Sequence, residues 1–218
     1  MDLYHLFQDL EKNTDSEKAK KMSAYMRNQF LFLGVQATTR KKVSHPYFKE
    51  AKKTRMIDWK FISECWEKPY REAQYVAIDY LNTLKDLLVL EDSEKIKAMI
   101  VNKSWWDTVD GLHRVVGSLA LNYPELNKTL ILWSLDENMW LRRVAIDHQL
   151  LRKEKTNKEL LEEIISHNFG QEEFFINKAI GWALRDYSKE NPKWVRAFIE
   201  KYKENLSKLS IREGSKYI

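Results

Sequence analysis

Apolar residues recur along this chain at the spacing of amphipathic helices, and no segment shows the strict alternation of an exposed strand. The run Leu3, Leu6, Phe7 and Leu10 predicts a first helix, and a second one starts at Ser16. Pro46 favours a further helix start, because proline is well tolerated in a first helical turn. From there the pattern predicts five helix pairs: 59–66 with 70–84, 93–101 with 105–121, 124–135 with 139–152, 158–166 with 172–188, and 192–202 with a last helix from 207.

Small residues recur inside the second helix of successive pairs. They stand at intervals of 34 residues, followed by one interval of 35: Ala77, Gly111, Ala145, Ala179 and Gly214. A fixed period of this size is typical of stacked helix pairs, each of which buries its apolar face only against its neighbours. The sequence therefore predicts an all-α fold, a right-handed solenoid of HEAT-like helix pairs with a concave face, forming a single domain over residues 1–218.

Composition supports helices and limits the chemistry. Six glycines and four prolines are few for a many-turned β fold. A single cysteine, Cys65, excludes an intramolecular disulfide and has no local pattern of a catalytic nucleophile. The amino-terminal residues lack a secretory pattern and no apolar run has the length of a membrane span, so we expect a cytoplasmic protein without a membrane partner.

The positive charge is concentrated in one stretch. The net charge is +5, and basic residues dominate between positions 36 and 60. These residues are Arg40, Lys41, Lys42, Lys49, Lys52, Lys53, Arg55 and Lys60. Such a surface attracts phosphate backbones, but charge alone equally fits a solvated lysine-rich face.

Numbering each second helix from its small residue aligns a mixed set of aromatic and charged side chains. Trp106, Asp110, Arg143 and Trp182 come from three successive repeats, and we expect them to converge on one cleft of the concave face. Each also has a plainer interpretation. The tryptophans are common core residues, the aspartate fits a solvated surface, and Arg143 fits an ion pair with Asp147.

Two smaller patterns concern the start of one helix and the binding of metals or cofactors. Ser104 followed by Asp107 predicts a capping box at the start of a helix. The chain has no HExxH motif, cysteine pair or glycine-rich phosphate loop, so we expect neither a metal nor a cofactor. Lys178 and His148 are interpreted as peripheral.

Five stretches resemble the AlkD family of DNA glycosylases, which are built of HEAT-like repeats. These stretches, in the family's order and spacing, are residues 25–34 (YMRNQFLFLG), 103–110 (KSWWDTVD), 140–143 (WLRR), 173–187 (EFFINKAIGWALRDY) and 206–213 (LSKLSIRE). The chain differs from the family pattern at the stretch Gly111-Leu112-His113-Arg114, at Arg142 and at Gly214.

The resemblance implies a monofunctional enzyme, a monomer that excises 3-methyladenine and 7-methylguanine from double-stranded DNA by hydrolysing the N-glycosidic bond, at the nucleoid. It implies that Asp110 is the catalytic carboxylate, that Trp106 and Trp182 flank the deoxyribose, and that Arg143 contacts phosphate. Tyr25 borders the same cleft. Together with the basic residues Arg40, Lys41 and Lys42, Tyr25 and Arg143 are the expected DNA contacts. The alternative is a helical-repeat scaffold that binds DNA or a protein without catalysis.

Overall fold

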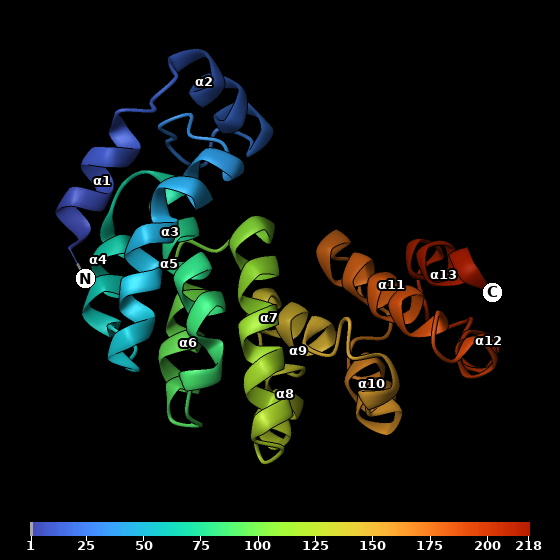
Figure 1. The fold of residues 1–218 in the computed structure, drawn as a ribbon. Helices are drawn as coiled ribbons and strands as arrows, with labels where there is room; N and C mark the ends of the chain where they lie inside the picture. Colours follow the sequence, from blue (N-terminus) through green and yellow to red (C-terminus); the bar gives the residue numbers. More distant parts are fainter. Residues whose placement is uncertain (1) are drawn as a thin grey trace. The chain divides into compact units, whose positions relative to one another are not determined.

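The structure is a computed structural model that describes residues 2–218, apart from the side chains of Leu3 and Tyr4. The predicted apolar position Leu3 therefore lies outside the described side chains. Over the described range the chain forms thirteen α-helices and three short 3₁₀ turns, with a lone bridge between Leu31 and Tyr70 in place of any strand (Figure 1). The all-α helical-repeat prediction is confirmed, while the handedness and the concave face stay predictions.

The chain divides into two compact units, which end and begin at Leu88 and Val89. The single domain expected over residues 1–218 stays a prediction. The helices of the first unit are α1 (Leu3–Glu11), α2 (Ser16–Tyr25), α3 (Ala37–Thr54), α4 (Trp59–Glu67) and α5 (Arg71–Leu84), followed by the turn η1 (Lys85–Leu87). Helix α5 packs against both α3 and α4, and α1 packs against α3.

Helix α3 begins earlier than the sequence suggested. It starts at Ala37, so Pro46 lies inside the helix rather than at its start, and that prediction was wrong. Proline removes one helical hydrogen bond, leaving the carbonyl of Lys42 without that partner. Pro46 is exposed, so water can replace the missing bond and the helix continues.

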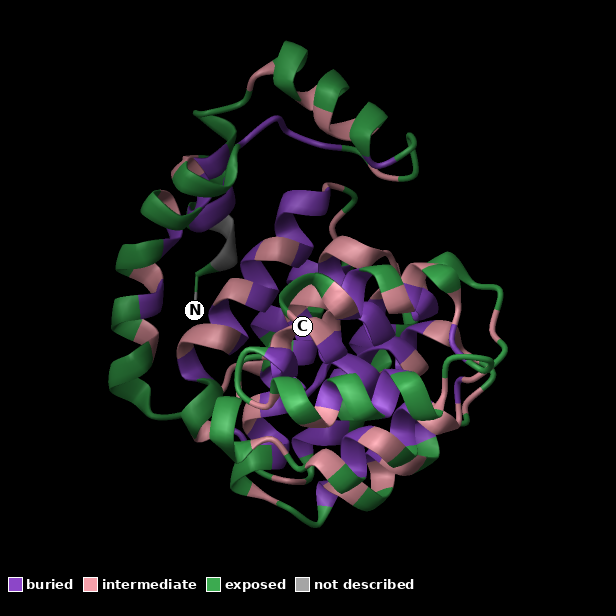
Figure 2. Ribbon diagram, turned by 90° about the vertical axis from the view of Figure 1, so that its right-hand side faces the viewer, coloured by how far each residue is buried: buried purple, intermediate pink, exposed green. Residues whose placement is uncertain are grey.

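A buried carboxylate organises the loop between α2 and α3. Glu72, in the first turn of α5, accepts hydrogen bonds from the backbone nitrogens of Leu33 (3.0 Å), Gly34 (3.0 Å) and Val35 (3.1 Å). Gly34 has a φ of +85°, and a Cβ there would lie 2.0 Å from the carbonyl oxygen of Asp15, so glycine is required. Helix α2 itself has no buried residue, as the helix at the top of Figure 2 shows.

The second unit repeats one arrangement of paired helices. Its elements are α6 (Asp92–Val101), α7 (Trp106–Asn122), α8 (Leu126–Trp133), α9 (Met139–Asp147), η2 (Lys153–Lys155), α10 (Lys158–Ser166), α11 (Phe174–Ser188), α12 (Pro192–Lys201), α13 (Lys208–Gly214) and η3 (Ser215–Tyr217). The second helices of successive pairs pack in order, α7 on α9, α9 on α11 and α11 on α13. Helix α9 ends at Asp147, five residues before the predicted end, and the backbone at Leu151 is left-handed (φ 67°).

The small residues of the 34-residue period are packing positions. Ala77, Ala145, Ala179 and Gly214 are buried, and Gly111 is half-buried. One further glycine allows a still closer approach. A Cβ on Gly117 would lie 2.3 Å from the carbonyl oxygen of His148, so α7 reaches the end of α9 only because this position has no side chain.

The cysteine belongs to the core of the first unit. Cys65 is fully buried on α4, and burial raises the pKa of its thiol. The amide of the buried Gln74 donates hydrogen bonds to the carbonyl oxygens of Cys65, Trp66 and Lys68, which fixes the end of α4 against α5. None of the described helices has the length and apolar character to cross a membrane.

Candidate functional site

An ion pair between α7 and α9 lies at the centre of the predicted site. The Nε of Arg143 donates to Oδ1 of Asp110 at 2.9 Å, and its Nη2 lies 2.8 Å from the same oxygen. The Nη1 of Arg143 donates to the carbonyl oxygen of Phe175 on α11 at 2.7 Å. Arg143 is only 1% exposed. One guanidinium thus connects three successive second helices and holds the Asp110 carboxylate in place.

Trp182 lies beside this ion pair, on α11. The guanidinium carbon of Arg143 is 5.2 Å from the centre of the indole ring, and the charged ends of Lys178 and Arg185 are 5.8 and 6.0 Å away. Cations at these distances are attracted to the face of an indole. Trp182 is half-buried, so part of the ring is accessible.

Glu213 holds the outer two of these cations. Its carboxylate lies 3.0 Å from Nζ of Lys178, 3.1 Å from Nη1 of Arg185 and 2.7 Å from Nζ of Lys216. The hydrogen bonds from Lys216 and Lys178 lower the pKa of Glu213 to about 2. This acid of α13 therefore fixes charged side chains of α11 around Trp182.

Trp106 is the first residue of α7, one helical turn before Asp110, and it is half-buried. The helix is not capped as predicted. Trp105 is the N-cap without a side-chain hydrogen bond, and the hydroxyl of Ser104 donates to the carbonyl oxygen of Ile100 at 2.6 Å. The predicted capping box was wrong, because α7 begins at Trp106 with Trp105 as its N-cap, one residue later than Ser104 would require. The Trp105 ring instead packs in an aromatic cluster with Trp140 and Phe175.

The Asp110 carboxyl is mostly enclosed. Burial raises the pKa of Asp110, while the charge of Arg143 and its hydrogen bond oppose that rise. A carboxylate in such a place is poorly solvated but firmly oriented, because water screens it little and the guanidinium fixes it. The arrangement suits an acid that meets a developing positive charge.

Three buried polar residues of α7 and of the end of α9 were not predicted as site residues. Asp147 is fully buried, with its Oδ2 3.7 Å from Nη2 of Arg143, and the buried His113 lies on α7 one turn after Asp110. His148, expected to be peripheral, is also buried, with Nδ1 2.6 Å from the carbonyl oxygen of Ala145. Arg143 does lie near Asp147, as the plainer interpretation proposed, but its hydrogen bonds go to Asp110 and Phe175.

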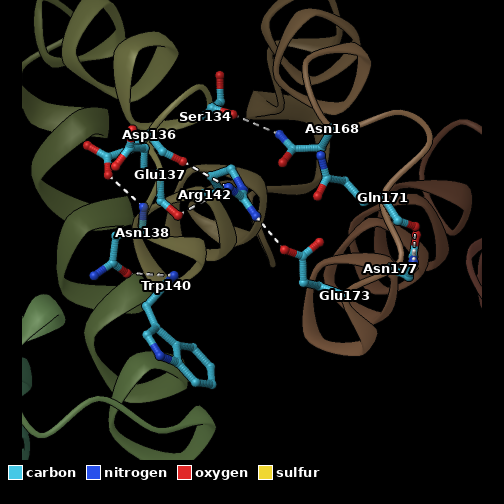
Figure 3. A network of polar contacts seen from close by, with 10 residues as sticks. All are labelled: Ser134, Asp136, Glu137, Asn138, Trp140, Arg142, Asn168, Gln171, Glu173 and Asn177. Carbon is cyan, nitrogen blue, oxygen red and sulfur yellow. Dashed lines mark hydrogen bonds and ion pairs between the residues drawn. The ribbon is translucent and has the colours of Figure 1, made fainter.

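Arg142 fixes the start of α9 (Figure 3). Its Nη1 donates to the carbonyl oxygens of Asp136 (2.9 Å) and Glu137 (3.3 Å), and its Nη2 donates to Glu173 at the start of α11 (3.2 Å). The side chain of Asn138 caps α9 by accepting from the backbone nitrogen of Trp140. The departure from the family pattern at Arg142 thus has a structural function, because it ties together the helices that carry Arg143 and Trp182.

The other predicted DNA contacts belong to the first unit. Tyr25 is the last residue of α2 and is 71% exposed. Lys41 and Lys42 are exposed on α3, whereas Arg40 is buried, with its Nε donating to Asp79 at 3.0 Å. Their contacts with DNA stay predictions, and Arg40 has a clear structural partner.

A basic cavity follows the exposed side of α3. It measures about 650 Å³, and its lining consists of Lys41, His45, Phe48, Lys49, Lys52, Asp79, Asn82 and Thr83. The polar α3 residues of this lining follow one another at intervals of three or four positions, which places them on one face of the helix: Lys41, His45, Lys49 and Lys52.

Comparison with known proteins decides the family. The profile of the family described as DNA alkylation repair enzyme matches residues 6–218, nearly the whole chain. The chain belongs to the DNA alkylation repair enzyme family. A solved structure, described as a predicted DNA alkylation repair enzyme from Enterococcus faecalis, is 41% identical and superposes with a TM-score of 0.86, covering 94% of this chain and 96% of that chain. A search of curated proteins gives no match.

Membership of the DNA alkylation repair enzyme family confirms the resemblance that the sequence motifs indicated. It supports an enzyme of alkylation repair with DNA as the substrate class. The glycosylase reaction, its substrates and the roles of individual residues go beyond that membership.

Proposed function

We propose that this member of the DNA alkylation repair family is a monofunctional glycosylase. It removes cationic purines such as 3-methyladenine and 7-methylguanine from double-stranded DNA, acting as a monomer by hydrolysis of the N-glycosidic bond. The observation that carries the proposal is the enclosed Asp110 carboxylate, oriented by the buried Arg143 beside the accessible ring of Trp182.

The reaction needs little more than this. Alkylation at N3 or N7 gives the purine a positive charge, so the glycosidic electron pair leaves with the base without much help from an acid. Positive charge then develops on the deoxyribose, where a nearby carboxylate stabilises it. Water adds to the sugar carbon, and the Asp110 carboxylate orients it and accepts its proton. No lysine nucleophile takes part, so we expect no lyase step.

In this proposal Trp106 and Trp182 flank the sugar. Indole faces attract a cation, and both tryptophans are half-buried rather than sealed in the core. Lys178 and Arg185, which surround Trp182, are suited to the phosphates on either side of the lesion. The Trp182 surface thus combines an aromatic contact for the sugar with charges for the backbone.

Arg143 takes a more specific part than the resemblance implies. It is only 1% exposed and its nitrogens already bond Asp110 and Phe175, so little of the guanidinium is accessible to a phosphate. We therefore propose that its main part is to orient Asp110. In the first unit, Lys41 and Lys42 bind further phosphates, with Tyr25 as an additional contact. The buried pair of Arg40 with Asp79 supports the helix that carries these lysines.

The decisive experiment is base release from methylated duplex DNA under single-turnover conditions. Asp110→Asn is expected to slow excision by about a hundredfold or more, because it removes the charge that stabilises the sugar cation. DNA affinity should stay equal or rise slightly, since a charge that repels phosphate is lost. Asp107→Asn, on the same helix, is the matched control and should change the rate little.

Two results would contradict the proposal. Excision at the wild-type rate by Asp110→Asn would remove the carboxylate from the mechanism. Duplex binding by the wild-type protein without any release of methylated bases would favour the binding scaffold instead.

A further inference from the structure

Two buried polar residues beside the Asp110–Arg143 pair have unused hydrogen-bonding groups. Both carboxylate oxygens of Asp147 lack a hydrogen-bond partner, and so does Nδ1 of His113, among the side chains that the structure describes. Asp147 is 0% exposed and His113 is 6% exposed. One side-chain atom each of Asp110, His113 and Asp147 lie within 4.8 Å of one another. This is a distance that a single bridging water spans.

The charges of this cluster do not balance if every acid is ionised. Arg143 is the guanidinium within reach of both Asp110 and Asp147, and its hydrogen bonds go to Asp110. Its Nη2 is 3.7 Å from Asp147, too far for a hydrogen bond. Two carboxylates against one guanidinium would leave a net negative charge in the core, which is costly. A proton on Asp147 removes that charge and provides a donor for the unused nitrogen of His113.

We propose that Asp147 and His113 share one proton as a buried neutral pair, and that this pair keeps Arg143 bonded to Asp110. The proton resides on Asp147, and Nδ1 of His113 accepts it through a hydrogen bond or one bridging water. Both are positioning residues for Asp110, and neither touches the substrate. Their significance for catalysis rests on the proposed glycosylase function, whereas the pair itself does not.

The electrostatic surroundings agree with this placement of the proton. Burial raises the pKa of Asp147 to about 7, with the charge of Asp110 adding to the rise and that of Arg143 opposing it. Burial lowers the pKa of His113 to about 3, helped by the positive charges of Arg114 and Arg143. The acid therefore keeps its proton in the folded protein while the imidazole stays neutral.

His148 lies outside this cluster, because the atoms within 4.8 Å of one another come from Asp110, His113 and Asp147 among the described residues, although Nε2 of His148 is also buried without a hydrogen-bond partner. His148 is buried beside α9, and burial lowers its pKa to about 3 as well. Its Nδ1 is already hydrogen-bonded to the carbonyl oxygen of Ala145. That carbonyl needs a donor, so the proton of the neutral His148 ring is on Nδ1.

Loss of the shared proton changes the balance around Arg143. An ionised Asp147 attracts Nη2 of Arg143 across the 3.7 Å gap and competes with Asp110 for it. The Asp110 carboxylate is then held less firmly. We therefore expect base excision to fall as the pH rises through neutrality, and to stay level in Asp147→Asn, whose amide imitates the protonated acid.

The test measures unfolding of the full chain by urea between pH 4 and 6.5. In the wild type the pair holds one proton when folded and one when unfolded, so it adds no pH dependence. Asp147→Asn leaves a buried neutral histidine that takes up a proton on unfolding. The stability of this variant relative to wild type should therefore rise with pH, so that its unfolding equilibrium constant falls about tenfold per pH unit relative to wild type. His113→Leu leaves a buried protonated acid, and its stability should change by the same factor in the opposite direction. The double variant should run parallel to wild type.

Several outcomes would overturn the pair. Single variants whose stability runs parallel to that of wild type, or shifts with pH in the same direction, would contradict the proposal. Nitrogen-15 NMR of labelled histidine gives a second measurement that needs no stable variant of Asp147. His113, assigned by its missing signal in His113→Leu, should stay neutral with an unprotonated Nδ1 from pH 5 to 7, and an imidazolium at pH 6 would contradict the proposal. Stabilisation of the wild type but not of Asp147→Asn by Zn²⁺ would identify a metal site instead.

The proposed glycosylase activity and the Asp147–His113 pair are tested by different outcomes. If no variant and no wild-type protein releases methylated bases, the glycosylase proposal fails while the opposite unfolding slopes still stand. If wild type and Asp147→Asn release bases with the same pH profile and unfold in parallel, the pair fails and the glycosylase stands.

Discussion

The two units of the protein each bury a carboxylate completely, and they treat it in opposite ways. Glu72 of the first unit accepts three backbone N–H groups, whereas Asp147 of the second unit accepts none. Both residues are 0% exposed. Burial alone therefore does not decide the state of an acid. The donors aimed at a buried carboxyl group decide how its oxygens are satisfied.

Glu213 shows a third solution between these two. Glu213 is only 4% exposed and thus nearly as buried as Asp147, but three side-chain cations surround its carboxylate. Its pKa is lowered to about 2, in contrast to the raised pKa of Asp147. Three buried acids thus differ in whether backbone groups, side-chain cations or a proton compensate their charge.

The largest effect is expected at Glu72. Glu72→Gln replaces one acceptor oxygen by an NH₂ group facing backbone donors, so at least one buried N–H loses its partner and the loop loses its anion. We expect the free energy of unfolding to fall by about 3–5 kcal/mol. Urea denaturation at pH 7 measures it, with the exposed Glu67→Gln as control. Equal stability of the two variants would show that the loop does not depend on the charge.

An effect of opposite sign and at most similar size is expected at Asp147. Its folded pKa, about 7, lies above the unfolded value of roughly 3.9, so ionisation of this carboxyl by itself costs stability as the pH rises from about 4 to 7, and in the wild type the neutral His113 offsets that cost below about pH 6.5. Asp147→Asn cannot ionise and avoids this loss. At pH 8 the variant should be more stable than wild type by up to roughly 4 kcal/mol, about 1.4 kcal/mol for each of the roughly three pH units between the two pKa values, and the gain should vanish near pH 4. A variant that is less stable at pH 8 would show that Asp147 stabilises the fold in its ionised form, which would contradict the prediction.

The smallest effect is expected at Glu213. Its pKa is lowered in the folded state, so its stabilisation is present above the unfolded value near 4.3 and is lost as the pH falls towards 2. Lys178 and Lys216 are partly exposed, so water weakens these ion pairs. Glu213→Gln should therefore cost about 1 kcal/mol at pH 7 and nothing near pH 2. The exposed pair of Glu200 with Lys203 offers the control, because Glu200→Gln should change stability negligibly at either pH.

The periodic part of the fold was predictable because it depends on local sequence. The 34-residue interval located the second helices, and four of its five small residues are buried in their packing. Local rules failed where other contacts intervened. Pro46 lies inside a helix because water can replace the missing hydrogen bond at this exposed position. The Ser104 hydroxyl donates to the carbonyl oxygen of Ile100, and Trp105 is the N-cap of the following helix.

The candidate site was predictable only in part. Repeat register placed Asp110 and Arg143 on neighbouring helices, and the structure shows them bonded across 33 positions. The burial of Asp147, His113 and His148 did not follow from the register, because neighbouring helices supply it. An acid four residues after Arg143 was a visible signal, but it fits an exposed pair equally well.

The burial of the single cysteine affects how this protein reacts with alkylating reagents. The electrophiles that alkylate purines also attack thiols, and they do so through the thiolate. Cys65 is fully buried on α4, and burial raises its pKa, so the thiolate is scarce and out of reach. The core packing of the first unit thereby protects this thiol from alkylating reagents.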